Sequence, residues 1–224
     1  MGKVTSDMSM SLDGFIAGPN DGVERPLGDG GERLHEWVYG LASWRERHGL
    51  AGGKTDRDAE VIDESFKTTG AVVLGRRMFN LGEGPWGDNP PFHVPVFVVT
   101  HNAREKVVKE GGTTFTFVTD GIESALQQAQ AAAGDKDVSV AGGANIVQQF
   151  IKAALLDEVQ IHLVPVLLSN WMHWSASGIG GTDENERGRP GRQDTFSRYL
   201  RAAAGRVPSS PLGWAHRGRR SEGY

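Results

Sequence analysis

The stretch that most constrains the fold runs from Val138 to Leu168 and combines an apolar strand, two glycines, an amphipathic helix and a second strand. Apolar residues at helical spacing predict a helix over residues 145–155, and alternating apolar and polar residues predict a strand over residues 159–163. Gly142 and Gly143 separate the first strand from the helix. The pair is either a tight turn, or a place where backbone N–H groups approach an anion such as a dinucleotide pyrophosphate. The spacing alone favours neither reading.

The same alternation of strands and helices extends back to the N-terminus. Apolar periodicities predict strands over residues 4–12, 71–74, 94–99, 113–118 and 138–141, and helices over residues 32–48 and 58–68. Asp120 and Glu123 resemble a capping box that starts a further helix, which Gly134 ends. Such alternation predicts an α/β fold with a mostly parallel central sheet and helices on both faces, a three-layer arrangement.

Three predicted strand ends carry groups that suit an anion. They are Gly75-Arg76-Arg77, Thr100-His101 and Gly142-Gly143. Ligands of parallel sheets bind outside the carboxyl ends of the strands, so three such ends together are a stronger signal than any one. Alternatively, Arg76 and Arg77 are solvated surface residues. Cations at the start of a helix oppose its dipole, which mildly favours an anionic ligand as the reason for their presence. Asp13-Gly14 is equally a turn signal between two apolar segments.

The totals exclude several classes of protein. The formal net charge is −4, which argues against nucleic-acid binding by bulk electrostatics. There is no cysteine, and the histidines show no metal-ligand spacing, so neither a disulfide framework nor a metal site is expected. The N-terminus lacks a secretory apolar segment and no apolar run is long enough to span a membrane. A cytoplasmic protein is therefore expected.

The composition divides the chain after Leu168. Residues 1–168 hold 15 Lys and Arg against 23 Asp and Glu, whereas residues 169–224 hold nine Arg, no Lys and five acidic residues. The second part has only five Val, Ile, Leu or Phe in 56 residues, too few to offset the entropy of ordering it. The sequence thus predicts a folded domain over residues 1–168 and an irregular, disordered Arg- and Gly-rich tail over residues 169–224.

Four segments together resemble the dihydrofolate reductase-like family. More narrowly, they resemble the C-terminal reductase domain of bifunctional riboflavin-biosynthesis deaminase-reductases and its free-standing bacterial relatives. The segments are SLDGFIAG (Ser11–Gly18), VVLGRRMF (Val72–Phe79), PVFVVTH (Pro95–His101) and VAGGANIVQQFIKAALLDEVQIHLVPVLL (Val140–Leu168). The resemblance covers residues 3–168 in the family's order and implies a dihydrofolate reductase-like fold.

The resemblance also implies NADPH as the cofactor and assigns residues to it. The phosphates would be held by Gly75, Arg76 and Arg77, the adenosine 2′-phosphate region by Thr100 and His101, and the pyrophosphate by the turn formed by Gly142, Gly143, Ala144, Asn145 and Ile146. Ile16 and Ala17 would lie over the nicotinamide, with Asp13 near the reacting end as a candidate proton relay. Dihydrofolate reductases carry a catalytic carboxylate on the helix before the Gly-Arg strand, and Glu60 and Glu64 are both candidates for that place.

The implied activity is hydride transfer from NADPH to a small heterocyclic substrate. The riboflavin-pathway precedent is reduction of 5-amino-6-(5-phosphoribosylamino)uracil, and no deaminase motif is present. Two alternatives stay open: an NADP-binding protein without turnover, and an interaction protein that uses its Arg-rich tail. A small-molecule substrate is expected, without nucleic acid or membrane. Relatives often pair, which leaves a homodimer open, and the sequence does not fix the oligomeric state.

The sequence departs from the family after Leu168. The family continues with a short apolar segment and a final strand pair, whereas here the chain continues SNWMHWSASGIGGTDENERGRPGRQ. Arginine without lysine, among glycines and scattered tryptophans, is typical of a GC-rich gene read out of frame. We therefore hypothesise that residues 169–224 are a frameshifted or degenerate terminus, and that the C-terminal strand pair is missing and leaves an exposed sheet edge.

Overall fold

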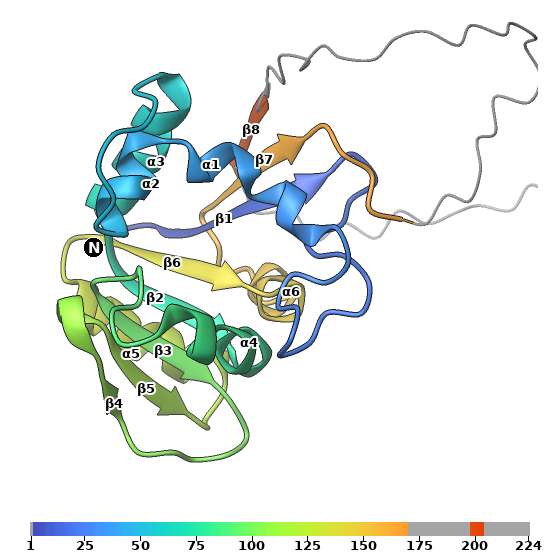
Figure 1. Ribbon diagram of the computed structural model, residues 1–224. Helices are drawn as coiled ribbons and strands as arrows, with labels where there is room; N and C mark the ends of the chain where they lie inside the picture. Colours follow the sequence, from blue (N-terminus) through green and yellow to red (C-terminus); the bar gives the residue numbers. More distant parts are fainter. Residues whose placement is uncertain (1, 170–197, 204–224) are drawn as a thin grey trace, which may run out of the picture.

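The computed structural model describes residues 2–169 and 198–203 of the 224-residue chain. Within these residues a single sheet has the strand order β4-β5-β3-β2-β6-β1-β7-β8 (Figure 1). The strands are β1 (Val4–Ser11), β2 (Thr69–Gly75), β3 (Pro95–Val99), β4 (Val107–Val108), β5 (Thr114–Val118), β6 (Asp137–Gly142), β7 (Glu158–Val164) and β8 (Arg198–Ala203). Neighbouring strands from β5 to β7 are parallel, and only the outermost pairs, β4 with β5 and β7 with β8, are antiparallel. The expected mostly parallel α/β sheet is confirmed.

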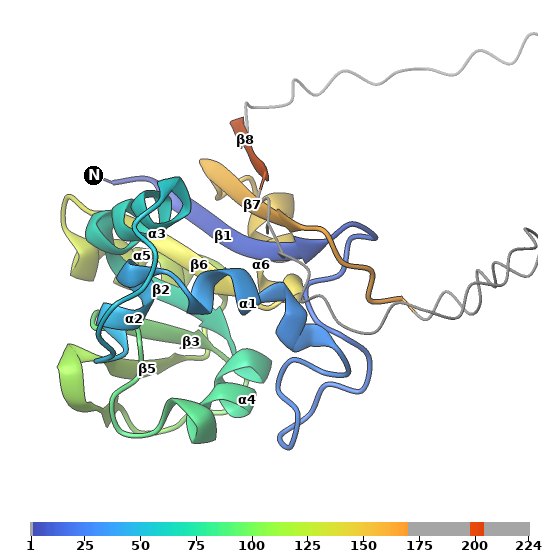
Figure 2. The same ribbon diagram turned by 45° about the horizontal axis from the view of Figure 1, so that its top comes forward.

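Helices cover both faces of this sheet (Figures 1 and 2). They are η1 (Gly31–Leu34), α1 (Glu36–Tyr39), α2 (Ala42–Arg47), α3 (Arg57–Thr68), α4 (Arg76–Trp86), η2 (Glu110–Gly112), α5 (Ile122–Ala133) and α6 (Ala144–Lys152). Side chains of α5 and α6 bury one face together with Val73, Phe97 and Val138. On the opposite face, α1 and α3 share an apolar cluster with Val164 of β7, and α4 packs through Phe79 on β2 and β3.

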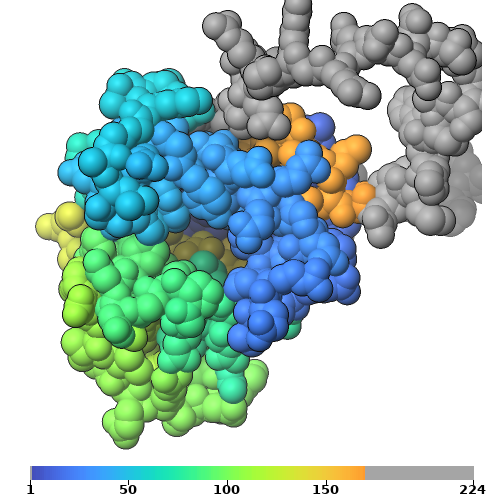
Figure 3. Space-filling model, in the orientation of Figure 1, coloured from blue at the N-terminus to red at the C-terminus, as the bar shows by residue number. Residues whose placement is uncertain are grey.

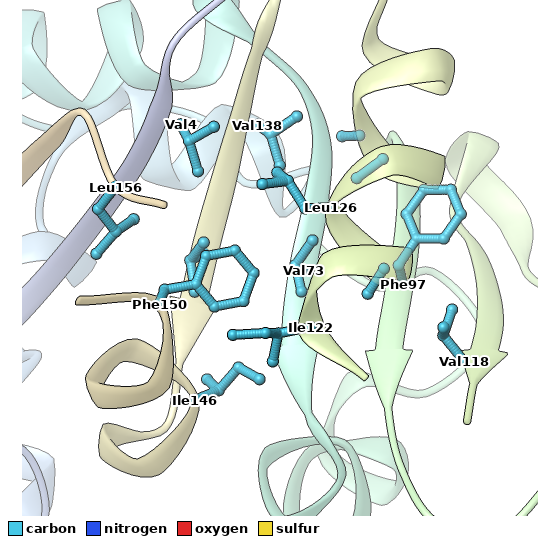
Figure 4. Close-up of a cluster of buried hydrophobic side chains, with 14 of the residues drawn as sticks. Val4, Val73, Phe97, Val118, Ile122, Leu126, Val138, Ile146, Phe150 and Leu156 are labelled. Atoms are coloured by element: carbon cyan, nitrogen blue, oxygen red, sulfur yellow. The ribbon is translucent and has the colours of Figure 1, made fainter. Parts of the chain in front are cut away.

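The largest cluster of buried side chains lies between the sheet and the helices α5 and α6 (Figure 4). Phe150 of α6 is completely buried there, next to Ile146 one turn earlier. Of the apolar residues that predicted this helix, Ile146, Val147 and Phe150 form its buried face, which confirms a helix here. The predicted extension to residue 155 is wrong, because the helix ends at Lys152, and Ile151 is exposed. The buried face fixes where the N-terminus of α6 meets the end of β6.

Several predicted boundaries differ from the structure. The helix expected over residues 32–48 is divided into η1, α1 and α2, because Leu41 adopts an extended conformation (ψ 141°) and bridges to Lys54. The capping box is wrong: Gly121, with φ of 96°, is the N-cap of α5, and no side chain caps that helix. The helix α4 continues through Gly82 and Gly84 to Trp86, with Pro85 inside its last turn. The short strand β4 had no signal in the sequence.

The expectation of an entirely irregular segment after Leu168 needs one correction. Residues Arg198–Ala203 form β8, which pairs antiparallel with β7 from Leu163↔Arg198 to Glu158↔Ala203. Strand pairing uses backbone groups, so the open edge of β7 is a template for a segment whose side chains give little strand signal. Residues 170–197 and 204–224 lie outside the described residues, and the rest of the tail hypothesis stays a prediction. None of the described helices is long and apolar enough to cross a membrane.

Candidate functional site

The parallel order of the central strands brings the expected site residues to one edge of the sheet. The strands β3, β2, β6 and β1 are neighbours, so Thr100, Gly75, Gly142 and the loop after Ser11 follow adjacent carboxyl ends. On the surface, a hollow opens between the blue N-terminal part and the green residues near α4 (Figure 3). Yellow to gold atoms of the chain form its floor. The three anion-suited strand ends are therefore neighbours, as the sequence predicts.

The turn Gly142-Gly143 joins β6 directly to the N-terminus of α6. Gly142 has φ of 121°, a conformation that side-chain-bearing residues rarely adopt, and the peptide bond to Gly143 is cis. A Cβ built on Gly143 would meet no atom within 4 Å, so this turn faces open space. Ala144 and Asn145, which open the helix, are exposed, while Ile146 is buried. Bare backbone at a helix N-terminus is what a pyrophosphate needs, so these residues fit the implied cofactor.

The two arginines at the start of α4 have different partners. Arg77 donates from Nε to Asp21 Oδ2 (3.0 Å) and from a terminal nitrogen to the Asp21 carbonyl (3.1 Å), which ties the loop after β1 to α4. Arg76 faces Asn102, whose side-chain oxygen, in the amide orientation that satisfies both groups, accepts from the guanidinium (3.1 Å to one nitrogen). An open groove of about 420 Å³ runs between these elements. It is lined by Asp21, Gly22, Val23, Arg76, Arg77, Asn80 and Leu81.

The end of β3 is held by its own turn. Thr100 is buried, and its hydroxyl accepts the N–H of Asn102 (3.1 Å), while its own N–H donates to Val118 (3.0 Å). His101 is exposed. The structure thus gives Thr100 the part of shaping the turn that carries Asn102 toward Arg76, and leaves His101 accessible to a ligand.

The loop after β1 is closed by a turn at Gly14, where φ is 86°. Ser11 N–H donates to Phe15 O (2.9 Å) and Ser11 Oγ accepts from Phe15 N–H (2.9 Å), so the turn alternative for Asp13-Gly14 is confirmed. Ile16 and Ala17 follow as half-buried residues. This turn ends β1 at Ser11.

Asp13 is engaged by the chain that follows β7. Its carboxylate accepts the N–H of Ser169 (2.7 Å) and that of Leu168 (3.2 Å). The nearby hydroxyl groups of Ser11 and Ser169, together with these backbone N–H groups, hold the pKa of Asp13 well below its usual range. A carboxylate so stabilised in its charged form is a poor proton donor. The role of Asp13 near the reacting end of a cofactor stays a prediction.

Glu60 and Glu64, the alternative carboxylates, both lie exposed on α3, and Glu60 pairs with Arg57 (2.8 Å). Among the described residues no group of three His, Asp or Glu could hold a metal ion. The residues gathered at this edge, glycines at a helix N-terminus and cations beside them, therefore suit an organic phosphate.

Comparison with known proteins identifies the family of this chain. The family model described as RibD C-terminal domain matches residues 2–172. The chain belongs to this family. A solved structure from Shewanella sp. PV-4, whose name refers to riboflavin biosynthesis, is 21% identical, with 74% of this chain and 78% of that chain covered and a TM-score of 0.48. Dihydrofolate reductase from Enterococcus faecalis, complexed with NADP(H) and RAB-propyl, is 16% identical, with 75% and 74% covered and a TM-score of 0.42. The comparison with curated proteins finds no match.

In this RibD C-terminal domain, sequence reasoning missed the buried polar face of β1 and β7. The first strand was expected to bury one face, but both are covered, and Ser6 and Ser11 are among its buried residues. In β7, Gln160 and His162 are buried, while the alternate residues Val159 and Ile161 are only half-buried. The signal was present in the sequence as polar residues at every second position of the two strands, but the sequence alone did not show that these residues face one another.

The contacts of Asp13 predict the effect of pH on stability. Because folding lowers its pKa, Asp13 stabilises the RibD C-terminal domain above the ordinary aspartate pKa of about 4, and this stabilisation is lost as pH falls below it. We expect Asp13→Asn to be less stable than the parent at pH 7, with the difference shrinking toward pH 3. Urea unfolding at several pH values measures this. Asp120→Asn, on an exposed turn, is the control, and a pH-independent difference would contradict the prediction.

Proposed function

We propose that this RibD C-terminal domain is an NADPH-dependent reductase that transfers hydride to a small pyrimidine- or pterin-like substrate. The model substrate is 5-amino-6-(5-phosphoribosylamino)uracil, which would be reduced to its ribityl form. Family membership supports the reductase-like role. The observation that carries the proposal is that the Gly142-Gly143 turn, Arg76 and His101 follow the neighbouring strands β6, β2 and β3, where backbone N–H groups and polar or cationic side chains suit the phosphates of a dinucleotide.

Each part of the edge would contribute one function. The exposed N–H groups at the start of α6 would bind the pyrophosphate, because the helix dipole favours negative charge there. Arg76 would bind the adenosine 2′-phosphate through its guanidinium, with His101 beside it. Ile16 and Ala17 would exclude water from the nicotinamide. When bound, NADPH supplies the hydride, and the protein positions the acceptor carbon against it.

The first test is thermal unfolding of the full chain with NADPH and with NADH. A ligand at 100 times its dissociation constant stabilises by about 2.7 kcal/mol, a shift of a few degrees at this size. We expect a larger shift with NADPH than with NADH. A cooperative transition that neither cofactor moves would refute a dinucleotide site at the Gly142-Gly143 turn.

The two arginines are expected to differ. Arg76→Ala should weaken NADPH binding roughly 10- to 100-fold and leave NADH almost unchanged, since one charge-assisted hydrogen bond is worth about 1.5–3 kcal/mol. Arg77→Ala should weaken both cofactors similarly, because Arg77 is bound to Asp21 and organises the loop after β1. Fluorescence titration measures the four affinities. Arg57→Ala on α3 is the control, and equal losses for NADPH and NADH in Arg76→Ala would contradict the assignment.

A further inference from the structure

A group of polar side chains lies buried in the middle of the sheet, between β1, β7 and α1. Asp7 and Ser9 of β1 stand in register with Gln160 and His162 of β7. The side chain of His162 is 2% exposed, whereas that of Asp7 is 22% exposed. Of this ionisable pair, the carboxylate is therefore the member that solvent or a ligand reaches.

The contacts make one connected unit. His162 Nε2 contacts Asp7 Oδ1, and Gln160 Nε2 donates to Asp7 Oδ2 (3.3 Å). The ring of Trp37 from α1 covers the imidazole at 4.6 Å between centroids, and its Nε1–H donates to Ser9 Oγ (3.1 Å). Both carboxylate oxygens are thus oriented by β7, and the imidazole is held between that carboxylate and the indole.

Packing alone does not explain an ionisable pair at this place. The surrounding residues of the same face, among them Leu34, Val38 and Val164, fill their positions with apolar side chains. Removing an ionisable pair from water carries a desolvation penalty that well-packed apolar residues avoid, so such pairs are weak contributors to stability. The pair is also unused by the cofactor site proposed above.

The reduction needs a proton as well as a hydride, and Asp13 does not suit that task. Its carboxylate accepts two backbone N–H groups after β7 and is stabilised in its charged form. Asp7 lies on β1, the strand that precedes the turn of Asp13, on the face that carries α1. On the same face of β7, Glu158 binds Lys3 (3.2 Å), and α1 carries the exposed Glu36.

We propose that Asp7 and His162 form the proton-supplying unit of this reductase, an inference that rests on the proposed function. The acceptor carbon of a C=O or C=N bond receives the hydride from C4 of the reduced nicotinamide, which is oxidised. The π electrons of that bond move to its oxygen or nitrogen, which takes the proton held between His162 Nε2 and Asp7 Oδ1. Asp7 contacts the substrate atom. His162 positions the Asp7 carboxylate and passes it a proton, and water then returns a proton to the pair.

The test compares the full-length parent with Asp7→Asn and with the control Asp63→Asn, an exposed aspartate on α3. Dissociation constants for NADPH are measured first, and we expect all three to agree within about twofold. Single-turnover oxidation of NADPH with 5-amino-6-(5-phosphoribosylamino)uracil is then followed from pH 5 to 9. General acid catalysis contributes roughly 10²- to 10⁴-fold, so Asp7→Asn should be at least 100-fold slower, with a flattened pH profile, and Asp63→Asn unchanged.

A second readout needs no turnover. The ring-nitrogen chemical shifts of His162 are recorded in the ¹⁵N-labelled protein with NADP⁺, before and after adding the same pyrimidine. We expect the His162 signals to shift in the parent and not in Asp7→Asn. Should Asp7→Asn fail to unfold cooperatively, Asp7→Glu and His162→Gln replace it; the first should restore part of the rate and keep the acid limb of the profile, and the second should lose that limb.

The outcomes separate the two proposals. If the parent does not bind NADPH, both the proposed reductase and the proton unit are refuted. Intact NADPH binding with equal turnover in Asp7→Asn and the parent overturns the proton unit alone. The parent can also bind NADPH without reducing this pyrimidine. In that case, His162 chemical shifts that do not change when the pyrimidine is added overturn the proton unit, and shifts that change support it.

Discussion

Replacing Phe150 with alanine is expected to lower the free energy of unfolding by about 3–5 kcal/mol, the largest loss from any single truncation discussed for this domain. The side chain is completely buried and contacts the cluster that joins α6 to the sheet (Figure 4). Removing the ring deletes its transfer free energy and leaves a cavity that a close-packed interior refills only partly. Urea unfolding at pH 7 measures the loss.

The neighbouring residue offers a matched control. Ile151 is on the same helix but 54% exposed, so Ile151→Ala should change the free energy of unfolding by no more than about 0.5 kcal/mol. A loss of less than about 1 kcal/mol in Phe150→Ala would contradict the packing described for α6. Since Phe150 holds the helix whose N-terminus meets Gly143, we also expect weaker NADPH binding in any folded fraction of this variant.

Gly142→Ala is expected to cost both stability and cofactor binding. With φ of 121°, Gly142 adopts a backbone conformation that an alanine reaches only with strain, roughly 1–3 kcal/mol. Relief of that strain would move the turn that positions the start of α6. We therefore expect a lower melting temperature together with an affinity for NADPH reduced at least tenfold, measured by calorimetry and fluorescence titration.

Gly143→Ala separates the two effects. Gly143 has φ of −79°, and a Cβ there would point into open space, so the fold should tolerate it. That same space is where we place the pyrophosphate, so binding of NADPH should still fall. If Gly143→Ala bound NADPH as tightly as the parent, the pyrophosphate would have to lie elsewhere, and the assignment of this turn would be wrong.

The parts of the fold that depend on periodicity were predictable from the sequence. Helix α6 and strands β2, β3 and β6 have apolar patterns that only a buried face explains, and a parallel sheet follows from their alternation. Boundaries set by local backbone geometry were not predictable. Asp120 and Glu123 read as a cap, yet Gly121 takes that place with a positive φ, a choice that depends on tertiary contacts.

For the site, the strand ends were predictable and the pairing of side chains was not. Glycine and arginine after strands indicated the anion edge, but nothing in the sequence showed that Asp21 would bind Arg77, 56 residues away. Nor could it show that the amides of Leu168 and Ser169 would hold the Asp13 carboxylate. The alternating polar residues of β1 and β7 could not be interpreted from the sequence, because the ring of Trp37 that covers His162 comes from a distant helix.

The central position of β1 also has a consequence for biosynthesis. Of the described strands of the domain, β1 is translated before the others, yet it pairs with β6 through Val4↔Val138 and with β7 as far as Ser11↔Val164. At ribosomal rates of about 5–20 residues per second, its partners emerge roughly 7–30 s later. The nascent chain therefore carries an unpaired strand until nearly the whole domain has been made. Such non-local pairing slows folding and leaves the growing polypeptide dependent on protection from aggregation.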